Sequence, residues 1–183
     1  MKFKTLLSVA LVLGPLVKSS ADQVPFAIVH GPKAAFNIAA PEGWVIDNTA
    51  GAENGLPCVL YRKGDTWENA DPLMYAKIAS TSVEDAEAFA KTAIEEMKKE
   101  RGEYKTKRVE SGKTKDGHAY FVNEYSPGEK YPRYQRVAYI QLPKAVAYVV
   151  YTADSEAAFR KHQSALQQLL ASFSFLEVEH EKS

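Results

Sequence analysis

The chain of 183 residues lacks several features on which a function is often built. It contains one cysteine, Cys58, so no disulfide can form within the chain. Its 23 Lys and Arg residues are balanced by 23 Asp and Glu residues, so there is no positive excess to attract nucleic acid or an anionic membrane surface. No run approaches about 20 apolar residues, the length that a transmembrane helix needs. We therefore expect neither a nucleic-acid partner nor integral membrane anchoring.

The motifs of common catalytic and metal sites are absent as well. The sequence has no GxSxG, HExxH or CxxC motif and no glycine-rich phosphate loop. Its four histidines are dispersed: His30, His118, His162 and His180. Oxygen chemistry would allow a calcium site at Asp65, Glu68 and Asp71, but the loop pattern of an EF-hand is missing. We expect no catalytic residue, no metal and no cofactor, although an enzyme remains open.

Cys58 lies in the apolar stretch LPCVLY, which favours a buried, inert thiol. The alternative is a nucleophilic thiol, for which His118 would be the partner if the fold brought the two together. His162 falls on the apolar side of a predicted helix and is interpreted as a packed residue.

Residues 1–21 have the pattern of a secretory signal peptide. Lys2 and Lys4 form a positive start, Leu6 to Val17 an apolar run, and Ser19-Ser20-Ala21 a small-residue cleavage site. Its removal would leave about 162 residues, with 20 basic against 23 acidic ones, because the signal carries three lysines. We expect an exported protein, periplasmic or secreted, with no lipid attachment.

The remaining chain is long enough for one domain with its own core. Residues 22–34, with two prolines, are expected to be an N-terminal tether with little structure. Residues 35–175 form a single predicted domain, and residues 176–183 a frayed C-terminal tail.

Strand patterns dominate this domain. The FNIAAPEGW stretch, 36–44, predicts a strand that Pro41 ends, a turn through Gly43 and a return of Trp44 to the core. Further strands are expected at 58–62, 73–79, 119–125, 134–142 and 145–151, the last being the most buried, with a polar edge strand at 107–115 and an Asp-Gly turn after it.

Two helices interrupt the strands. Apolar residues recur at helical spacing from Ala86 to Met97, after a cap expected at Thr81 or Ser82 and before Gly102. They recur again from Phe159 to Phe173, after the capping residues Asp154-Ser155. This order predicts an α+β fold, in which a curved antiparallel β-sheet packs against two main helices.

The order of these elements resembles a known family. The matching pieces are an F-x-I-x-x-P-x-G-W opening at 36–44, the helix at 83–97, the strand pieces 120–125 and 148–151, and Ser172-Phe173. They resemble the PsbP-like and DcrB-like exported proteins, a fold shared with a Ran-binding nuclear import factor. The resemblance implies a two-layer or sandwich arrangement used for binding and accessory roles, and it transfers no functional residue.

Two clusters are the candidate binding sites. Trp67 and Glu68 lie in an acidic loop, where burial would not place a tryptophan. Tyr131, Arg133, Tyr134 and Arg136 alternate aromatic and cationic side chains at the start of a strand. Tyr, Trp and Arg dominate binding hot spots. Both clusters also have a structural interpretation, as a loop anchor and a two-sided strand, and their opposite charges would allow them to meet.

The sequence therefore favours an exported, non-catalytic binding or accessory protein of the cell envelope, engaging a protein or small ligand. A small hydrolase or thiol enzyme using Cys58 and a self-associating envelope subunit are the alternatives.

Overall fold

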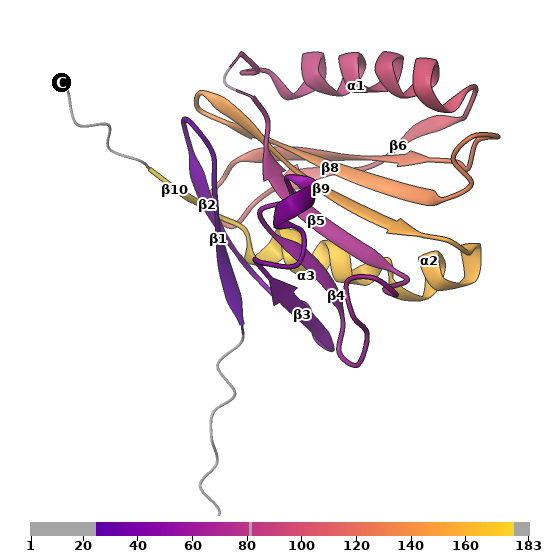
Figure 1. The fold of residues 1–183 in the computed structure, drawn as a ribbon. Coiled ribbons are helices and arrows are strands. Elements are labelled where there is room, and N and C mark those ends of the chain that lie inside the picture. Colours follow the sequence, from indigo (N-terminus) through magenta and orange to yellow (C-terminus); the bar gives the residue numbers. More distant parts are fainter. Residues whose placement is uncertain (1–24, 81, 178–183) are drawn as a thin grey trace, which may run out of the picture.

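The chain folds as an antiparallel sheet with helices against both of its faces (Figure 1). The computed structural model describes residues 25–80 and 82–177, so the expected signal peptide at 1–21 lies outside the described residues. The strands are β1 (Phe26–His30), β2 (Ala35–Ala39), β3 (Trp44–Asp47), β4 (Val59–Arg62), β5 (Leu73–Ile78), β6 (Thr106–Lys113), β7 (Ala119–Tyr125), β8 (Tyr134–Leu142), β9 (Ala145–Ala153) and β10 (Ser174–Leu176). The helices are α1 (Ala86–Arg101), α2 (Glu156–His162) and α3 (Ser164–Ser172), with a 3-10 turn, η1, at Ala52–Asn54.

The main sheet has seven strands in the order β3-β4-β5-β9-β8-β7-β6, and every neighbouring pair is antiparallel. Strand β9 is central, and all its residues except Tyr148 are buried, which confirms the expectation from its apolar run. The polar strand β6 lies at one edge, as its composition predicts. Gly117, in the turn between β6 and β7, has a φ of 91°, a conformation that glycine adopts readily.

The FNIAAPEGW stretch links the two sheets. Phe36 and Ile38 on β2 and Trp44 on β3 are all buried, as the alternation predicts. Between them the amide of Trp44 donates to the carbonyl of Pro41 at 3.0 Å, which closes the turn. Strand β2 belongs to a three-stranded sheet, β1-β2-β10, whereas β3 is an edge of the main sheet. This stretch is therefore the entry of the chain into the core.

The segment expected to be a tether differs from that expectation. Phe26–His30 form β1, which pairs with β2 from Phe26↔Ala39 to His30↔Ala35. Ala27 and Val29 point into the core and are buried. Pro25 and Pro32 flank the strand without interrupting it, so both prolines are compatible with pairing.

The first helix begins later than its sequence pattern indicates. Asp85 is the N-cap of α1, and its carboxylate accepts a hydrogen bond of 2.7 Å from the amide of Ala88. The cap expected at Ser82 is therefore wrong, since the carboxylate of Asp85 already satisfies a free amide of the first turn. Thr81, the other expected cap, lies outside the described residues. The helix ends as predicted, at Gly102.

The last helix is divided into α2 and α3 at Gln163. Ser155 caps α2 as expected, with its hydroxyl accepting from the amide of Ala158. Near the break, the buried Tyr151 hydroxyl donates to the carbonyl of Phe159 at 2.8 Å. This bond takes up the carbonyl that a continuous helix would use for Gln163.

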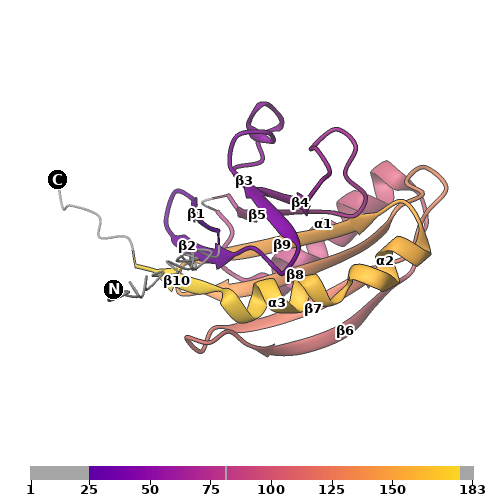
Figure 2. The ribbon, with the colours of Figure 1, turned by 90° about the horizontal axis from the view of Figure 1, so that it is seen from below.

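Two hydrophobic layers hold the domain together. Helices α2 and α3 and the small sheet cover one face of the main sheet, and α1 covers the other. Figure 2 shows α3 and α2 in line across their face. The α+β class with helices against a curved antiparallel sheet is thus confirmed. Among the described residues, no helix is both long and apolar enough to cross a membrane.

Candidate functional site

The residues that begin β8 send their side chains to opposite faces of the main sheet. Gln135 lies on the α1 face, where it accepts a hydrogen bond of 3.0 Å from Arg101 Nη1. Tyr134 lies on the other face, with its ring centroid 5.7 Å from that of Phe159 on α2. The candidate cluster at 131–136 is therefore divided between two surfaces.

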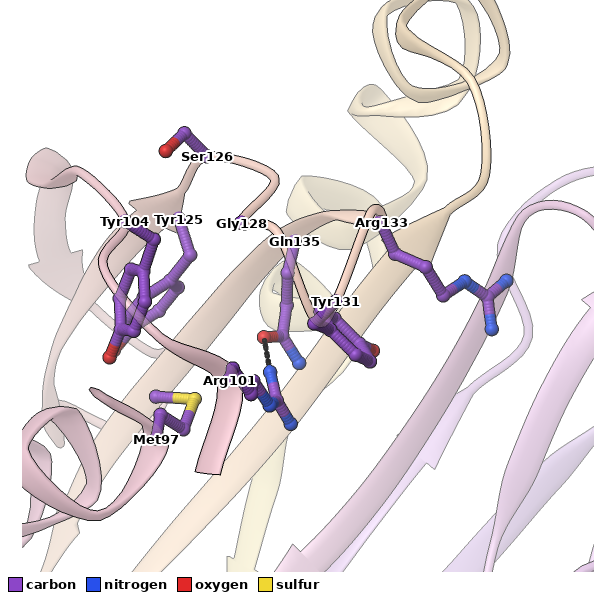
Figure 3. A pocket seen from close by; sticks show the side chains of 9 residues that line it. All are labelled: Met97, Arg101, Tyr104, Tyr125, Ser126, Gly128, Tyr131, Arg133 and Gln135. Carbon is purple, nitrogen blue, oxygen red and sulfur yellow. Dashed lines mark hydrogen bonds between the residues drawn. The ribbon is translucent and has the colours of Figure 1, made fainter. Parts of the chain in front are cut away.

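On the α1 face, Arg101 holds Tyr131 and Gln135 together. Its guanidinium carbon lies 3.8 Å from the centroid of the Tyr131 ring, a cation-π contact, and Figure 3 shows its bond to Gln135. Beside them is a pocket lined by Met97, Arg101, Tyr104, Tyr125, Ser126, Gly128, Tyr131, Arg133 and Gln135. The space inside is about 10 Å³, which is room for about one water molecule. Tyr131 is thus held by its contact with Arg101, beside a cavity that is too small for a ligand.

Arg133 points away from this group in Figure 3. Its Nε lies 2.6 Å from Asp154 Oδ1, and its Nη2 lies 3.9 Å from Asp71 Oδ1. Asp71 ends the acidic loop that carries Trp67. The two candidate clusters therefore meet through opposite charges, as the structural interpretation expects. The contact is between Arg133 and Asp71, and it does not involve Trp67 or Glu68.

Trp67 and Glu68 lie further out on that loop. Trp67 is half-buried and Glu68 is exposed. The Thr66 amide donates to Asn69 Oδ1 at 2.7 Å and closes the loop locally. Neither residue lines either of the pockets at the start of β8. Across residues 25–80 and 82–177, no group of three or more acidic, histidine or cysteine side chains is arranged to hold a metal ion.

The face that carries α2 has a larger pocket, which we call the Glu124 pocket. Its volume is about 550 Å³, within the range of small-molecule sites. It is lined by Lys105, Thr106, Lys107, Glu124, Tyr125, Ser126, Tyr134 and Arg160. Lys105, Thr106 and Lys107 come from β6 and the loop before it, and Arg160 comes from α2. The other four come from the end of β7 and the start of β8.

Glu124 is the buried charge of this pocket, with 9% of its surface exposed. Arg136, its cross-strand partner, donates to Glu124 Oε2 from Nε at 2.9 Å and from Nη2 at 2.6 Å. Burial by itself would raise the pKa of Glu124, but hydrogen bonds from Arg136 and Lys107 outweigh it and hold the pKa below the usual value. Glu124 is therefore an anion in the folded protein at neutral pH.

Two further cations surround the same carboxylate. Lys107 Nζ lies 3.2 Å from Glu124 Oε1, and Arg160 Nη1 lies 3.8 Å from Oε2. The carboxylate is thus shared by three cations from β6, β8 and α2. The single negative charge of Glu124 is neutralised mainly by Arg136, so it compensates the positive charges of Lys107 and Arg160 only in part.

Sequence reasoning identifies Tyr134 and Arg136 but misses Glu124, Lys107 and Arg160. One signal was present: Glu124 is the one charged residue in the strand AYFVNEY, and a carboxylate is rarely buried without a partner. Lys107 and Arg160 carry no local signal, because only the fold brings them to Glu124.

Cys58 occupies a different part of the molecule. It is fully buried, and desolvation followed by the nearby charge of Asp47 raises the pKa of its thiol to about 12. His118 is instead packed edge-on against Phe175, with ring centroids 5.1 Å apart. The prediction that the thiol is buried is confirmed, its inertness stays a prediction, and the alternative Cys58 and His118 pairing is wrong.

The architecture is that of an α+β protein whose antiparallel sheet is covered by helices on both faces, and its fold is PsbP-like. The structure is similar to the solution structure of cyanobacterial PsbP (CyanoP) from Synechocystis sp. PCC 6803, with a TM-score of 0.51 and 14% identity over 93% of this chain and 99% of that chain. A protein of unknown function from Pseudomonas aeruginosa, PA94, has a TM-score of 0.40 and 17% identity over 90% of this chain and 89% of that chain. No family model and no curated protein matches the sequence. The resemblance predicted from the FNIAAPEGW opening is thus confirmed at the level of the fold.

Proposed function

We propose that this chain is an exported, non-catalytic binding or accessory protein of the cell envelope, and that the Glu124 pocket is its contact site. The observation that carries the proposal is a pocket of about 550 Å³ that joins an aromatic wall, Tyr134, to a group of charged side chains. A cavity with apolar walls and a few convergent polar groups is the usual form of a binding site.

The proposed contacts follow from the distribution of the candidate residues. Tyr134 lines the pocket and Arg136 supports it through Glu124. Tyr131 and Arg133 lie at the same end of the sheet but on the other face, and Trp67 and Glu68 lie beyond Asp71. A small ligand would touch only the pocket, whereas a partner protein would also reach Arg133 and the Trp67 loop.

Export is tested by locating the full chain. We expect a C-terminally tagged chain in the periplasmic or secreted fraction, with a mass that shows cleavage near Asp22. The expectation rests on the signal-like pattern of residues 1–21. Recovery from the cytoplasm with those residues intact would contradict export.

Binding is tested by photo-crosslinking in living cells. A photoreactive phenylalanine analogue at Tyr134 should yield an adduct, because this side chain lines the pocket. The matched control is the same analogue at Lys144, an exposed residue in the turn at the opposite end of β8. No adduct at position 134, or equal adducts at both positions, would count against the pocket as the contact site.

Of the two alternatives, self-association has one observation in its favour. Strand β1 is an edge of the small sheet, and Phe26 and Ile28 on it are 69% and 41% exposed. An unprotected edge with apolar side chains can pair with a second copy. Sedimentation velocity over a range of concentrations tests this, and a constant monomer mass would exclude it. The buried Cys58 supports neither a thiol enzyme nor a disulfide dimer.

A further inference from the structure

The Glu124 pocket has more positive than negative charge. The charged residues that line it or pair within it are Lys105, Lys107, Arg136 and Arg160 on one side and Glu124 and Glu156 on the other. Four cations against two carboxylates leave an excess of two positive charges. This local excess occurs in a sequence whose Lys and Arg residues are balanced by Asp and Glu. The pocket therefore attracts anions although the protein as a whole does not.

The cations differ in how free they are to contact a ligand. Arg136 is only 14% exposed in its side chain and is fixed to Glu124 by two hydrogen bonds. Lys107 and Arg160 are 64% and 48% exposed, and their contacts with Glu124 are longer. Because Arg136 already satisfies the carboxylate, Lys107 and Arg160 can turn towards an anion without leaving Glu124 unpaired.

The pocket also has a hydroxyl that can donate a hydrogen bond. Ser126 lines the pocket, and its side-chain oxygen accepts from the amide of Lys105 at 2.8 Å, which leaves the Ser126 proton available to donate. The Thr106 side chain lies on the other face of the sheet, because Thr106 alternates with Lys107 and is paired with Tyr125 of the α1 side.

One wall of the pocket is aromatic. Tyr134 lines it, on the face of the sheet that carries α2. An aromatic wall next to a hydroxyl and cations fits a molecule with an apolar body and one charged end.

We propose that the Glu124 pocket binds a small organic anion, with a carboxylate or phosphate held by Lys107 and Arg160, and with an apolar body against Tyr134. This inference rests on the proposed binding function and adds the ligand class. Arginine and lysine are the usual partners of both oxyanions, and the bonds they form are charge-assisted.

The test uses the chain from Asp22 onward, labelled with 15N, and three probes of similar shape. Phenyl phosphate and benzoate should each give saturable NMR shifts at the amides of Thr106, Lys107 and Ser126, whereas neutral benzyl alcohol should not. Stronger binding of one anion identifies the oxyanion as phosphate or carboxylate. Binding should weaken as NaCl is raised, because salt screens partly exposed charges.

Single substitutions connect the binding to the named residues. Lys107→Gln and Arg160→Gln should each weaken anion binding about tenfold, as expected for loss of one charge-assisted hydrogen bond. Both positions are solvent-exposed, so the fold should be retained, which circular dichroism checks. Lys161→Gln is the matched control, since Lys161 lies next to Arg160 on α2 and does not line the pocket.

Three results would overturn the proposal: no saturable shift with either anion, equal binding of benzyl alcohol, or unchanged affinity in both Gln variants. An adduct at position 134 combined with no anion binding would refute the ligand class alone and leave the binding function in place. No adduct and no anion binding would refute both.

Discussion

Glu124 and Arg136 face each other across β7 and β8, joined by two hydrogen bonds to one carboxylate oxygen. Both side chains are largely buried, at 11% and 14% exposure. The pair lies beneath the pocket, so it fixes the pocket wall and also determines which cations remain available.

Glu124→Gln should lower the free energy of unfolding by about 2 kcal/mol, because Arg136 keeps its charge while losing its anionic partner. Urea denaturation of the two proteins measures this. Arg136→Gln and the double variant complete a cycle, in which the double variant should lose less than the sum of the single losses. Additive losses would show that the two residues do not interact.

The contribution of Glu124 to stability should depend on pH. Its pKa is lower in the folded protein than the ordinary value of 4.5, so its contribution is complete above about pH 5 and is lost as the pH falls through the folded value. The difference in unfolding free energy between wild type and Glu124→Gln should therefore shrink from pH 7 to pH 3. Other carboxylates titrate in both proteins and cancel. A difference that stays constant with pH would contradict the assigned ionisation.

The two tryptophans should contribute very unequally to stability. Trp44 is 4% exposed within the main core, so Trp44→Ala should cost about 3–5 kcal/mol. Trp67 is half-buried on a loop, and Trp67→Ala should cost about 1 kcal/mol or less. Urea denaturation followed by circular dichroism gives both values without relying on tryptophan fluorescence. A larger loss at Trp67 would show that it anchors its loop.

Cys58 should react slowly with iodoacetamide in the native protein at neutral pH. Its thiol is buried and its pKa is raised to about 12, so very little of it is thiolate. Mass spectrometry of the labelled protein follows the reaction, and the same protein in concentrated urea should be labelled rapidly. Fast labelling without urea would restore the thiol-enzyme alternative.

The Tyr151 hydroxyl should stabilise the junction of α2 and α3. Tyr151→Phe removes its bond to the Phe159 carbonyl and should lower the unfolding free energy by about 1 kcal/mol. Tyr148→Phe, on the other face of the same strand, is the matched control and should change less. Thermal or urea unfolding of both variants measures the two losses. Equal losses of unfolding free energy would show that the hydrogen bond to Phe159 does not stabilise the junction.

The parts of the fold predicted correctly are those in which neighbouring residues carry the information. The alternation of Phe36, Ile38 and Trp44 and the apolar run of β9 follow from which side chains must leave water. The break between α2 and α3 could not be predicted, because it depends on Tyr151, which reaches the helix only in the folded chain. Strand β1 was missed for a similar reason: a five-residue strand is stable only against its partner β2.

The candidate site was predicted only in part. Tyr134 and Arg136 are recognisable because aromatic and cationic residues alternate there. Glu124, Lys107 and Arg160 come from three separate elements, and their common feature is a position in space that periodicity does not encode. The Trp67 loop was predicted to contribute to binding because of its composition. Of this loop, only the last residue, Asp71, contacts Arg133.

The small sheet also constrains when the fold can form. Its middle strand, β2, lies near the start of the described chain and pairs with β10, which begins at Ser174, while Phe36 stacks on Phe173 at 4.6 Å. This closure cannot occur on the ribosome until β10 has emerged. Contacts so distant in sequence are slow to form. Until then the small sheet lacks its third strand and Phe36 lacks its stacking partner, so this part of the core closes last.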